Sequence, residues 1–571
     1  MIVPQEKRWI QPNKGTSEGN VHATWNVDFD ANRGHLHVSN PLKKVFDTTN
    51  DAQLTTTVAK FIEYDSKIFA ISNYVFRASA SVGSDITLST QWSQDATSNT
   101  PDPGATVTDA VVFDGLLLVQ DGNTIKSYNG TTWADWWKTT LGQSSLTQGQ
   151  PFVLKVGSDG NFYTTDGGNK VYRVTPTGTV TKTGEGTLDF SATPFIIVNG
   201  TTTSSRIFYG TEDTAGEDCA IIEWDMSPSS VAANRIHRMG TKRVLCIATD
   251  ANDMVVAILS DGSVKYFNGD SFVDYPGMHL PKTKYQYQDD VIHKNGWMIH
   301  DGMLHFAINP KVDIDEDVFT EVSSQFWNYP AGIYCLDPQV GLYCRYAFRD
   351  TTTNLSVPSI GSVGALYSRQ HKNTAFFTSF VRYLTASTTR SYIACEDRNN
   401  TTQSKAWLIL NPFEAYDNVI KKLTLIHKRL GTGDSITVYY RRFDEDPVRV
   451  TGVWYDSTTF NTTDSVTGIE NDWFVFSKIG AGAGYVSQVD SVDEGTTSVI
   501  TLKDANANVT LNDDGVLEFV NFKKMATITQ TTIEWDELAI PDTTKSRHLW
   551  IFLEITQAAG NDVELDYIIT E

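Results

Sequence analysis

Histidine, a frequent zinc ligand, gathers at two places in the sequence. His35 and His37 share one face of an expected strand, and His293, His300 and His305 follow one another within a short stretch. A zinc site needs further ligands at a suitable spacing, and no carboxylate or thiol stands at such a spacing here. We therefore expect these histidines to lie in the core or at interfaces, and we assign no metal.

The acidic run Asp313 to Asp317 (DIDED) is similar to the first half of a calcium-binding loop. An EF-hand loop requires glycine at its sixth position and glutamate at its twelfth. Counted from Asp313, these positions hold Val318 and Ser324. The sequence therefore predicts a solvated loop at this run.

The sequence contains no specific motif of a hydrolytic enzyme. The Asp-Gly turns at 157–160 and 260–262 lack the spacing and the tryptophan of the Asp-box turns of sialidases. Glycosidases use two carboxylates roughly 5–10 Å apart, and 68 acidic residues offer no basis for choosing a pair. No Gly-x-Ser-x-Gly motif occurs, and the glycines of 480–484 lack the Lys-Ser/Thr of a phosphate loop. We assign no catalytic residue and no cofactor.

Aromatic side chains are the remaining candidates for a binding surface. Trp133, Trp136 and Trp137 form the densest tryptophan cluster and are able to stack on sugars. Packing between sheets also uses large aromatic side chains. We favour the packing role for this cluster.

The charge balance excludes several partners. The chain has 46 Lys and Arg against 68 Asp and Glu, a formal charge of -22. Phosphate neutralisation supplies most of the affinity for nucleic acid, and anionic lipid attracts basic segments, so we expect neither partner. Residues 1–15 lack the apolar core of a secretory signal, and no stretch approaches the roughly 18 apolar residues of a membrane helix.

The cysteines indicate a reducing compartment. They are odd in number and scattered, without a Cys-x-x-Cys pair. We expect small buried thiols rather than disulfides at all five positions, namely Cys219, Cys246, Cys335, Cys344 and Cys395.

One design recurs from about residue 55 to 413. An apolar run, a glycine-containing turn and an aromatic run repeat, most clearly in 111–137 and 254–275. Asp-Gly and Asn-Gly between strands are strong hairpin signals, because type I′ turns need positive φ at both central residues. The sequence shows such pairs at 121–122, 129–130, 261–262 and 268–269.

About seven such units are present, each roughly 35–65 residues long, a period typical of propellers and solenoids. A four-stranded meander repeated radially is a propeller blade. No helical periodicity separates the units, which argues against a parallel βαβ sheet. We predict an all-β chain with a roughly seven-bladed β-propeller over residues 51–413.

Residues 1–50 precede the first unit and have too few apolar residues for a core of their own. We predict an extended arm that docks on another subunit or another protein by adding a strand to an exposed sheet edge. The competing interpretation is that this arm completes the last blade of its own chain.

The pattern changes after Pro412. Residues 421–443 show period-two alternation around Gly431 and Gly433, which predicts a hairpin. Further strands near the end indicate a β-sandwich of jelly-roll type over 414–571. A segment with its own pattern, about 452–518, predicts an inserted small β-barrel with a tight corner at 480–484.

Several segments together resemble the propeller-bearing structural proteins of tailed bacteriophages. They are the arm DANRGHLHVSNPL (30–42), the turns YNG (128–130) and FNG (267–269), the segment KLTLIHKRLGTGDSITVYYR (422–441) and the inserted unit that begins GAGYVSQVDSV (482–492). The resemblance implies a virion component, in the tail as a nozzle, a tail-tip piece or a fibre-attachment protein. It carries over no catalytic residue.

The first hypothesis is therefore a non-enzymatic virion protein, made in the host cytoplasm, that acts by assembly with other virion proteins and with further copies of itself. The second is a host-recognition module that binds surface glycans, and the third is a divergent propeller glycosidase. Binding to a glycan array would favour the second, and release of saccharide would favour the third.

Overall fold

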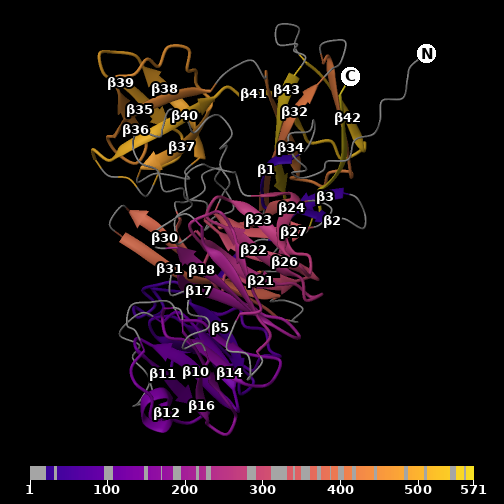
Figure 1. The fold of residues 1–571 in the computed structure, drawn as a ribbon. Coiled ribbons are helices and arrows are strands. Elements are labelled where there is room, and N and C mark those ends of the chain that lie inside the picture. Colours follow the sequence, from indigo (N-terminus) through magenta and orange to yellow (C-terminus); the bar gives the residue numbers. More distant parts are fainter. Residues whose placement is uncertain are drawn as a thin grey trace, which may run out of the picture.

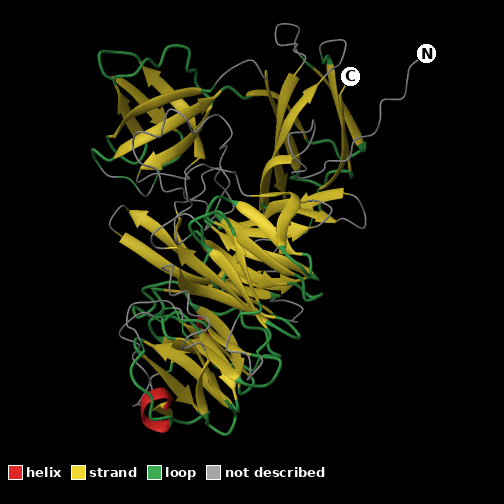
Figure 2. Ribbon diagram, viewed as in Figure 1, coloured by secondary structure: helices red, strands yellow, loops and turns green. Residues whose placement is uncertain are grey.

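The structure is a computed structural model. It describes residues 21–30, 35–40, 42–95, 107–146, 152–168, 170–183, 195–213, 218–226, 233–279, 291–309, 331–337, 341–348, 360–369, 375–385, 388–396, 404–414, 420–442, 447–480, 486–506, 509, 511–540, 548–558 and 561–570. Nearly all its regular structure is strand (Figures 1 and 2), with short helical segments at η1 (Ser89–Gln91) and η2 (Trp136–Thr140). The prediction of an all-β chain is confirmed.

Seven four-stranded antiparallel sheets lie within the described residues, as many as the predicted units, and the seventh takes its outer strand from the N-terminal segment. The first sheet consists of β5 (Lys60–Tyr64), β6 (Lys67–Ile71), β7 (Val75–Ala78) and β8 (Trp92–Gln94). The second consists of β9 (Ala110–Phe113), β10 (Leu116–Asp121), β11 (Thr124–Tyr128) and β12 (Trp133–Asp135). The third consists of β13 (Leu154–Val156), β14 (Phe162–Thr165), β15 (Val171–Val174) and β16 (Val180–Thr183).

The remaining four sheets continue the series. The fourth consists of β17 (Phe195–Thr202), β18 (Ile207–Asp213), β19 (Ala220–Trp224) and β20 (Arg235–Arg238). The fifth consists of β21 (Val244–Thr249), β22 (Val255–Leu259), β23 (Ser263–Phe267) and β24 (Phe272–His279). The sixth consists of β25 (Trp297–His300), β26 (Met303–Ile308), β27 (Gly332–Asp337) and β28 (Gly341–Ala347). The seventh consists of β29 (Ile360–Ser368), β30 (Phe376–Thr385), β31 (Thr388–Glu396) and β4 (Leu42–Asp47).

The seven sheets are arranged as a closed ring, consistent with a β-propeller. Each sheet shares a buried hydrophobic cluster with the next, and the seventh shares one with the first. The first strands of neighbouring sheets touch as well: β5 contacts β9, β9 contacts β13, β13 contacts β17, and β29 returns to β5. We call these first strands the inner strands.

The N-terminal segment closes this ring. Strand β4 pairs antiparallel with β31, so that Phe46 lies opposite Ile393 and Leu42 lies opposite Glu396. Phe46 is 3% exposed, and its ring lies 5.6 Å from that of Phe76 in the first sheet. The prediction that this arm docks outside its own chain is therefore wrong for its described part. The edge of β31 lies in the same chain, and β4 buries Val45 and Phe46 there.

Two five-stranded sheets face each other beyond the ring. One has the order β1-β32-β43-β34-β41, and the other has the order β2-β3-β44-β33-β42. The first holds β1 (Val21–Trp25), β32 (Ser404–Glu414), β43 (His548–Gln557), β34 (Ser435–Arg442) and β41 (Lys523–Ile528). The second holds β2 (Val27–Asp30), β3 (His35–Val38), β44 (Glu564–Thr570), β33 (Lys422–His427) and β42 (Trp535–Ala539).

Two predictions are corrected by these sheets. Residues 421–443 do not form a hairpin, because β33 pairs with β42 and β44 whereas β34 pairs with β41 and β43. Leu425 and Val438 instead face one buried core from opposite sheets. Residues 404–413 also do not belong to the repeats, because β4 occupies the edge of the seventh sheet and β32 pairs with β43.

The insertion is a closed barrel with the strand order β35-β36-β39-β38-β37-β40. Its strands are β35 (Val448–Trp454), β36 (Thr459–Thr462), β37 (Phe474–Gly480), β38 (Val486–Asp493), β39 (Ser498–Leu502) and β40 (Asp514–Val520), a slightly wider span than predicted. Gly452 is required by its position, since a Cβ there would lie 2.2 Å from the backbone oxygen of Asn461.

One hydrophobic cluster joins the three parts. The cluster between the fifth and sixth sheets also takes in Tyr439 and Phe552 from a five-stranded sheet and Phe474 from the barrel. The Tyr439 and Phe552 rings are stacked at 5.3 Å, and Phe474 meets Phe552 edge-on at 4.9 Å. Figure 1 shows the barrel and the two five-stranded sheets on the same side of the ring.

The predicted turns exist with a different geometry. Gly122 and Gly262 have positive φ, but Asp121 and Asp261 do not, so these pairs are not type I′ turns. Two other Asp-Gly pairs, 114–115 and 301–302, have positive φ at both residues.

We predict that Phe46→Ala lowers the free energy of unfolding by about 3–5 kcal/mol, because it opens a cavity at the strand that closes the ring. Leu88→Ala, which removes a side chain 57% exposed on the same part of the ring, changes it by less than about 0.5 kcal/mol. Urea unfolding checks both. Equal stability of the two variants would contradict closure by β4.

Candidate functional site

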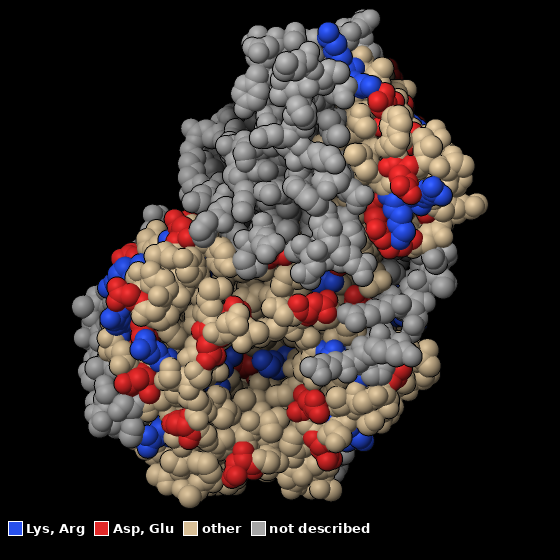
Figure 3. Space-filling model, turned by 90° about the vertical axis from the view of Figure 1, so that its right-hand side faces the viewer, with Lys and Arg blue, Asp and Glu red and all other residues tan. Residues whose placement is uncertain are grey.

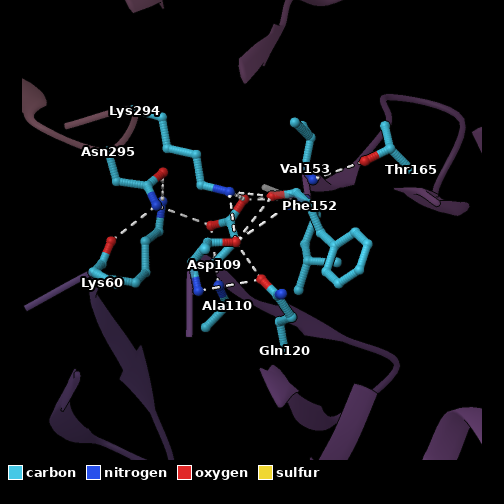
Figure 4. A network of polar contacts seen from close by, with 12 residues as sticks. Lys60, Asp109, Ala110, Gln120, Phe152, Val153, Thr165, Lys294 and Asn295 are labelled. Atoms are coloured by element: carbon cyan, nitrogen blue, oxygen red, sulfur yellow. Dashed lines mark hydrogen bonds and ion pairs between the residues drawn. The ribbon is translucent and has the colours of Figure 1, made fainter. Parts of the chain in front are cut away.

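The inner strands of the first, second and third sheets begin at one buried polar network, which the segment before the sixth sheet also joins (Figure 4). Lys60 opens β5, and Asp109 directly precedes β9. Lys294 and Asn295 lie shortly before β25. Because these elements belong to sheets on different sides of the ring, their side chains meet at its centre.

Asp109 lies in the middle of the network. Its side chain is 2% exposed. One carboxylate oxygen, Oδ1, accepts hydrogen bonds from Ala110 N at 3.0 Å and Asn295 Nδ2 at 3.0 Å. The other, Oδ2, accepts from Leu154 N at 3.0 Å and lies 3.9 Å from Lys294 Nζ. The carboxylate thus links the second sheet to the third and the sixth.

Asn295 extends the network to two more sheets. Its Nδ2 also donates to Ala59 O at 2.9 Å, and its Oδ1 accepts from Lys60 Nζ at 3.2 Å. Its backbone oxygen accepts from Leu366 N at 3.0 Å. The following Gly296 permits this turn, since a Cβ there would lie 2.9 Å from the backbone oxygen of His293.

Lys294 connects the second and third sheets. Its ammonium group donates to Thr108 Oγ1 at 3.1 Å and to the backbone oxygen of Phe152. Thr108 Oγ1 in turn accepts from Phe152 N at 3.2 Å. The Lys294 side chain is only 10% exposed, so its charge lies largely out of water.

Burial and mutual repulsion shift the pKa values of these groups. Burial lowers the pKa of Lys60 to about 8, with Lys155 adding to the shift and Asp109 opposing it. Burial also lowers the pKa of Lys294 to about 8 against the opposing charge of Asp109. Burial alone would raise the pKa of Asp109, but the ammonium groups, Lys294 foremost, hold it below its usual value. The aspartate is therefore ionised at neutral pH.

This arrangement joins sheets and concentrates charge. Acid–base catalysis needs a group that can exchange its proton with a substrate, whereas each oxygen of Asp109 already accepts hydrogen bonds from the protein. Lys60 and Lys294 remain mostly protonated at neutral pH. The chemistry that the network supports is structural linkage and attraction of anions.

The tryptophan cluster is part of the packing, as predicted. Trp133, Trp136 and Trp137 are at most 6% exposed. Trp133 stacks on Tyr128 at 4.8 Å, and Trp137 donates from Nε1 to the Ser144 backbone oxygen at 2.8 Å. None of the three presents a ring face for sugar stacking.

The predicted histidines lie at three separate places in the structure. His300 and His305 lie together with ring centroids 5.5 Å apart, and both are buried. The guanidinium of Arg345 lies 3.2 Å from His305 Nε2, and burial together with this charge lowers the pKa of His305. His37 Nε2 lies 3.6 Å from Asp28. His293 Nδ1 accepts from Asn295 N at 3.1 Å, and thus borders the central network.

The other candidate positions from the sequence have structural roles or lie outside the described residues. Asp159 accepts from Tyr163 OH at 2.6 Å within its turn. The run 313–317, the side chain of His35 and residues 481–485 lie outside the described residues. Within the part of the chain that is described, no group of three His, Cys, Asp or Glu side chains is arranged to hold a metal.

All five cysteines are buried free thiols. No helix among the described residues has the length and apolar character that a membrane crossing requires.

Sequence reasoning did not single out the central network. Asp109, Lys294 and Asn295 each stand directly before or close to the first strand of a repeat. Polar residues just before the first strand of several repeats could have indicated this network, because the first strands of a ring converge at its centre.

No protein-family model matches the sequence, and no curated protein matches it at a significant level. Solved structures show low similarity. The extracellular domain of a one-component system from B. thetaiotaomicron has a TM-score of 0.35 and 12% identity, over 66% of this chain and 52% of that chain. The match therefore spans about half of that domain.

Two further structures are propeller domains. The Dos1 propeller has a TM-score of 0.36 and 9% identity, over 62% of this chain and 95% of that chain. The C-terminal WD40 domain of Sif2 has a TM-score of 0.34 and 10% identity, over 62% of this chain and 98% of that chain. Similarity at this level carries no conclusion about function.

The lowered pKa of Lys60 predicts a pH-dependent stability. Between pH 8 and 10.5 the unfolded chain keeps a proton that folded Lys60 has lost, so this group's contribution to stability rises with pH. We therefore expect the stability of the wild type relative to Lys60→Met to rise by about 2–3 kcal/mol from pH 7 to pH 10.

Urea unfolding of both proteins at the two pH values measures this change, and titrating groups whose pKa does not depend on Lys60 cancel in the comparison. Lys170→Met, at an exposed lysine in the turn before β15, serves as the control and should show no such change. A pH-independent difference between wild type and Lys60→Met would show that the ammonium group is well solvated.

Proposed function

We propose that the chain is a structural component of a tailed-bacteriophage virion, placed in the tail as a nozzle, tail-tip or fibre-attachment protein. In this proposal the seven sheets are the blades of a seven-bladed propeller, and the two five-stranded sheets form a jelly-roll-like sandwich that carries the barrel. The protein acts by assembly with other virion proteins and with copies of itself.

The observation that carries the proposal is the hydrophobic cluster that joins the three parts. Tyr439, Phe552 and Phe474 pack in the same cluster as the fifth and sixth sheets. Asn26 adds a polar link, since its Oδ1 accepts from Ala347 N at 2.7 Å and its Nδ2 donates to Lys405 O at 3.0 Å. An architectural component needs such a block, because it must keep its shape while neighbours attach.

The buried charged side chains support a role in assembly over one in catalysis, because they bind other parts of the protein. Asp109 and Lys294 of the central network are bound to backbone and side-chain partners of the protein itself. The buried ion pair of Arg345 with Asp28, at 2.7 Å, likewise joins the sixth sheet to β2. These contacts use charge to fix sheets to one another.

Exposed apolar side chains offer contact points for neighbours. Trp535 is 52% exposed on β42, an edge strand of its sheet. Tyr455 and Leu511 are 58% and 59% exposed on the barrel, and their loops are joined by the hydrogen bond from Asn512 N to Trp454 O. Aromatic side chains of this kind often anchor protein interfaces.

Glycan binding is the second candidate. The exposed rings of Tyr455 and Trp535 favour it, because a flat aromatic face can stack on a sugar. The proposal of a glycosidase gains no such support from the described residues.

We predict that this chain co-purifies with intact phage particles in a fixed ratio to the major capsid protein and resists a high-salt wash. Mass spectrometry of gradient-purified particles measures the ratio, and an abundant non-virion protein from the same lysate is the control. Recovery only in the soluble fraction would contradict a virion role. Glycan-array binding or saccharide release by the soluble protein would then support the second or third hypothesis.

A further inference from the structure

One face of the molecule is hollowed near the middle of the ring, and basic and acidic side chains are visible inside the hollow (Figure 3). The charged residues that the inner strands and the segments just before them bring to the centre are Lys60, Asp109, Lys155 and Lys294. Three ammonium groups thus surround one carboxylate. His293 beside them is neutral, because burial lowers its pKa to about 3.

Lys155 is the unusual member of this group. It lies in β13 and is half-buried. Its charge acts on Lys60, Asp109 and Lys294, which belong to the first, second and sixth sheets. Lys155 therefore lies near groups that come from three separate parts of the ring. Among the described residues, Lys155 has no ion pair or side-chain hydrogen bond.

The ammonium group of Lys60 also has hydrogen-bond donors that no described residue accepts. This group carries three donors, and within the described part of the chain it makes one hydrogen bond, to Asn295 Oδ1. Asp109 is engaged by Lys294, Asn295 and Leu154 N. The carboxylate therefore compensates one ammonium group closely and leaves about two positive charges in the hollow.

An excess of positive charge here is notable in a chain with a formal charge of -22. Holding like charges together out of water is unfavourable unless an opposite charge compensates them. A bound anion would remove this penalty by accepting the free donors of Lys60 and Lys155.

We propose that the central hollow of the ring binds a tetrahedral oxyanion with two negative charges, a phosphate or sulfate group. Lys60 and Lys155 contact the anion, Lys294 adds its charge, and Asp109 with Asn295 positions the ammonium groups. Lysine binds such groups as a point charge, whereas recognition of planar carboxylates favours the fork of arginine. The overall acidity of the chain disfavours long polyanions and restricts the ligand to a small ion or a single terminal group.

Isothermal titration calorimetry of the full chain with sodium sulfate, at constant ionic strength kept by chloride, tests this proposal. We expect one saturable site, and we expect Lys155→Gln to weaken it at least about tenfold, in line with loss of a charged hydrogen bond. Lys155 has no described partner and its charge repels Lys60 and Lys294, so this variant should melt no lower than the wild type. Lys170→Gln makes the same charge change outside the hollow and should bind like the wild type.

A pH series shows whether protonation of the lysines controls binding, because sulfate keeps its charge between pH 7 and pH 9.5. The groups that face Lys60 and Lys294 are Lys155, Asp109 and His293, and the last two keep their charge state across this range. Loss of the protons of Lys60 and Lys294 should therefore weaken sulfate binding at least about tenfold at pH 9.5.

The source of the anion is distinguished by two further probes, inorganic phosphate and glucose 6-phosphate. Binding of inorganic phosphate alone assigns the site to a free ion, and binding of both assigns it to a phosphate group that a larger molecule can present. Absence of saturable binding by sulfate and both phosphates, or equal affinity of wild type and Lys155→Gln, would overturn the proposal.

Discussion

The buried carboxylate of Asp109 is the contact on which the centre of the ring depends. It accepts hydrogen bonds from the third sheet through Leu154 N and from the segment before the sixth sheet through Asn295. It also provides the negative charge beside Lys294. Without this charge, buried ammonium groups would repel one another in a medium that solvates them poorly. A single aspartate thus sets the position of side chains that come from several parts of the chain.

The ring is also held together at its outer edge, where strand β4 closes it. Strand β4 pairs with β31, and the strands just before it, β1 to β3, join the two five-stranded sheets. The first described residues therefore cross from one part of the molecule to another. Together with the aromatic cluster of Tyr439, Phe474 and Phe552, this path couples the ring, the paired sheets and the barrel mechanically, which is the property that an assembly role requires.

Local pattern was sufficient to predict strands, repeats and the barrel, because alternation and turn residues act within a few positions. It did not predict partners that are distant in sequence. Thr48 meets Ser391 across 343 positions, and nothing near β4 indicates that pairing. The segment around Gly431 alternates like a hairpin, yet its strands face each other across a core. Asp109 resembles any of 68 acidic residues until the fold brings lysines to it.

The most direct test of this account is a double-mutant cycle between Asp109 and Lys294. Urea unfolding would be measured for the wild type, Asp109→Asn, Lys294→Met and the double variant at pH 7. The account predicts that each single variant is destabilised and that the double variant is more stable than the sum of the two effects implies, with a coupling free energy of about 1–3 kcal/mol. Additive effects, within about 0.5 kcal/mol, would show that the two charges do not hold the centre of the ring together.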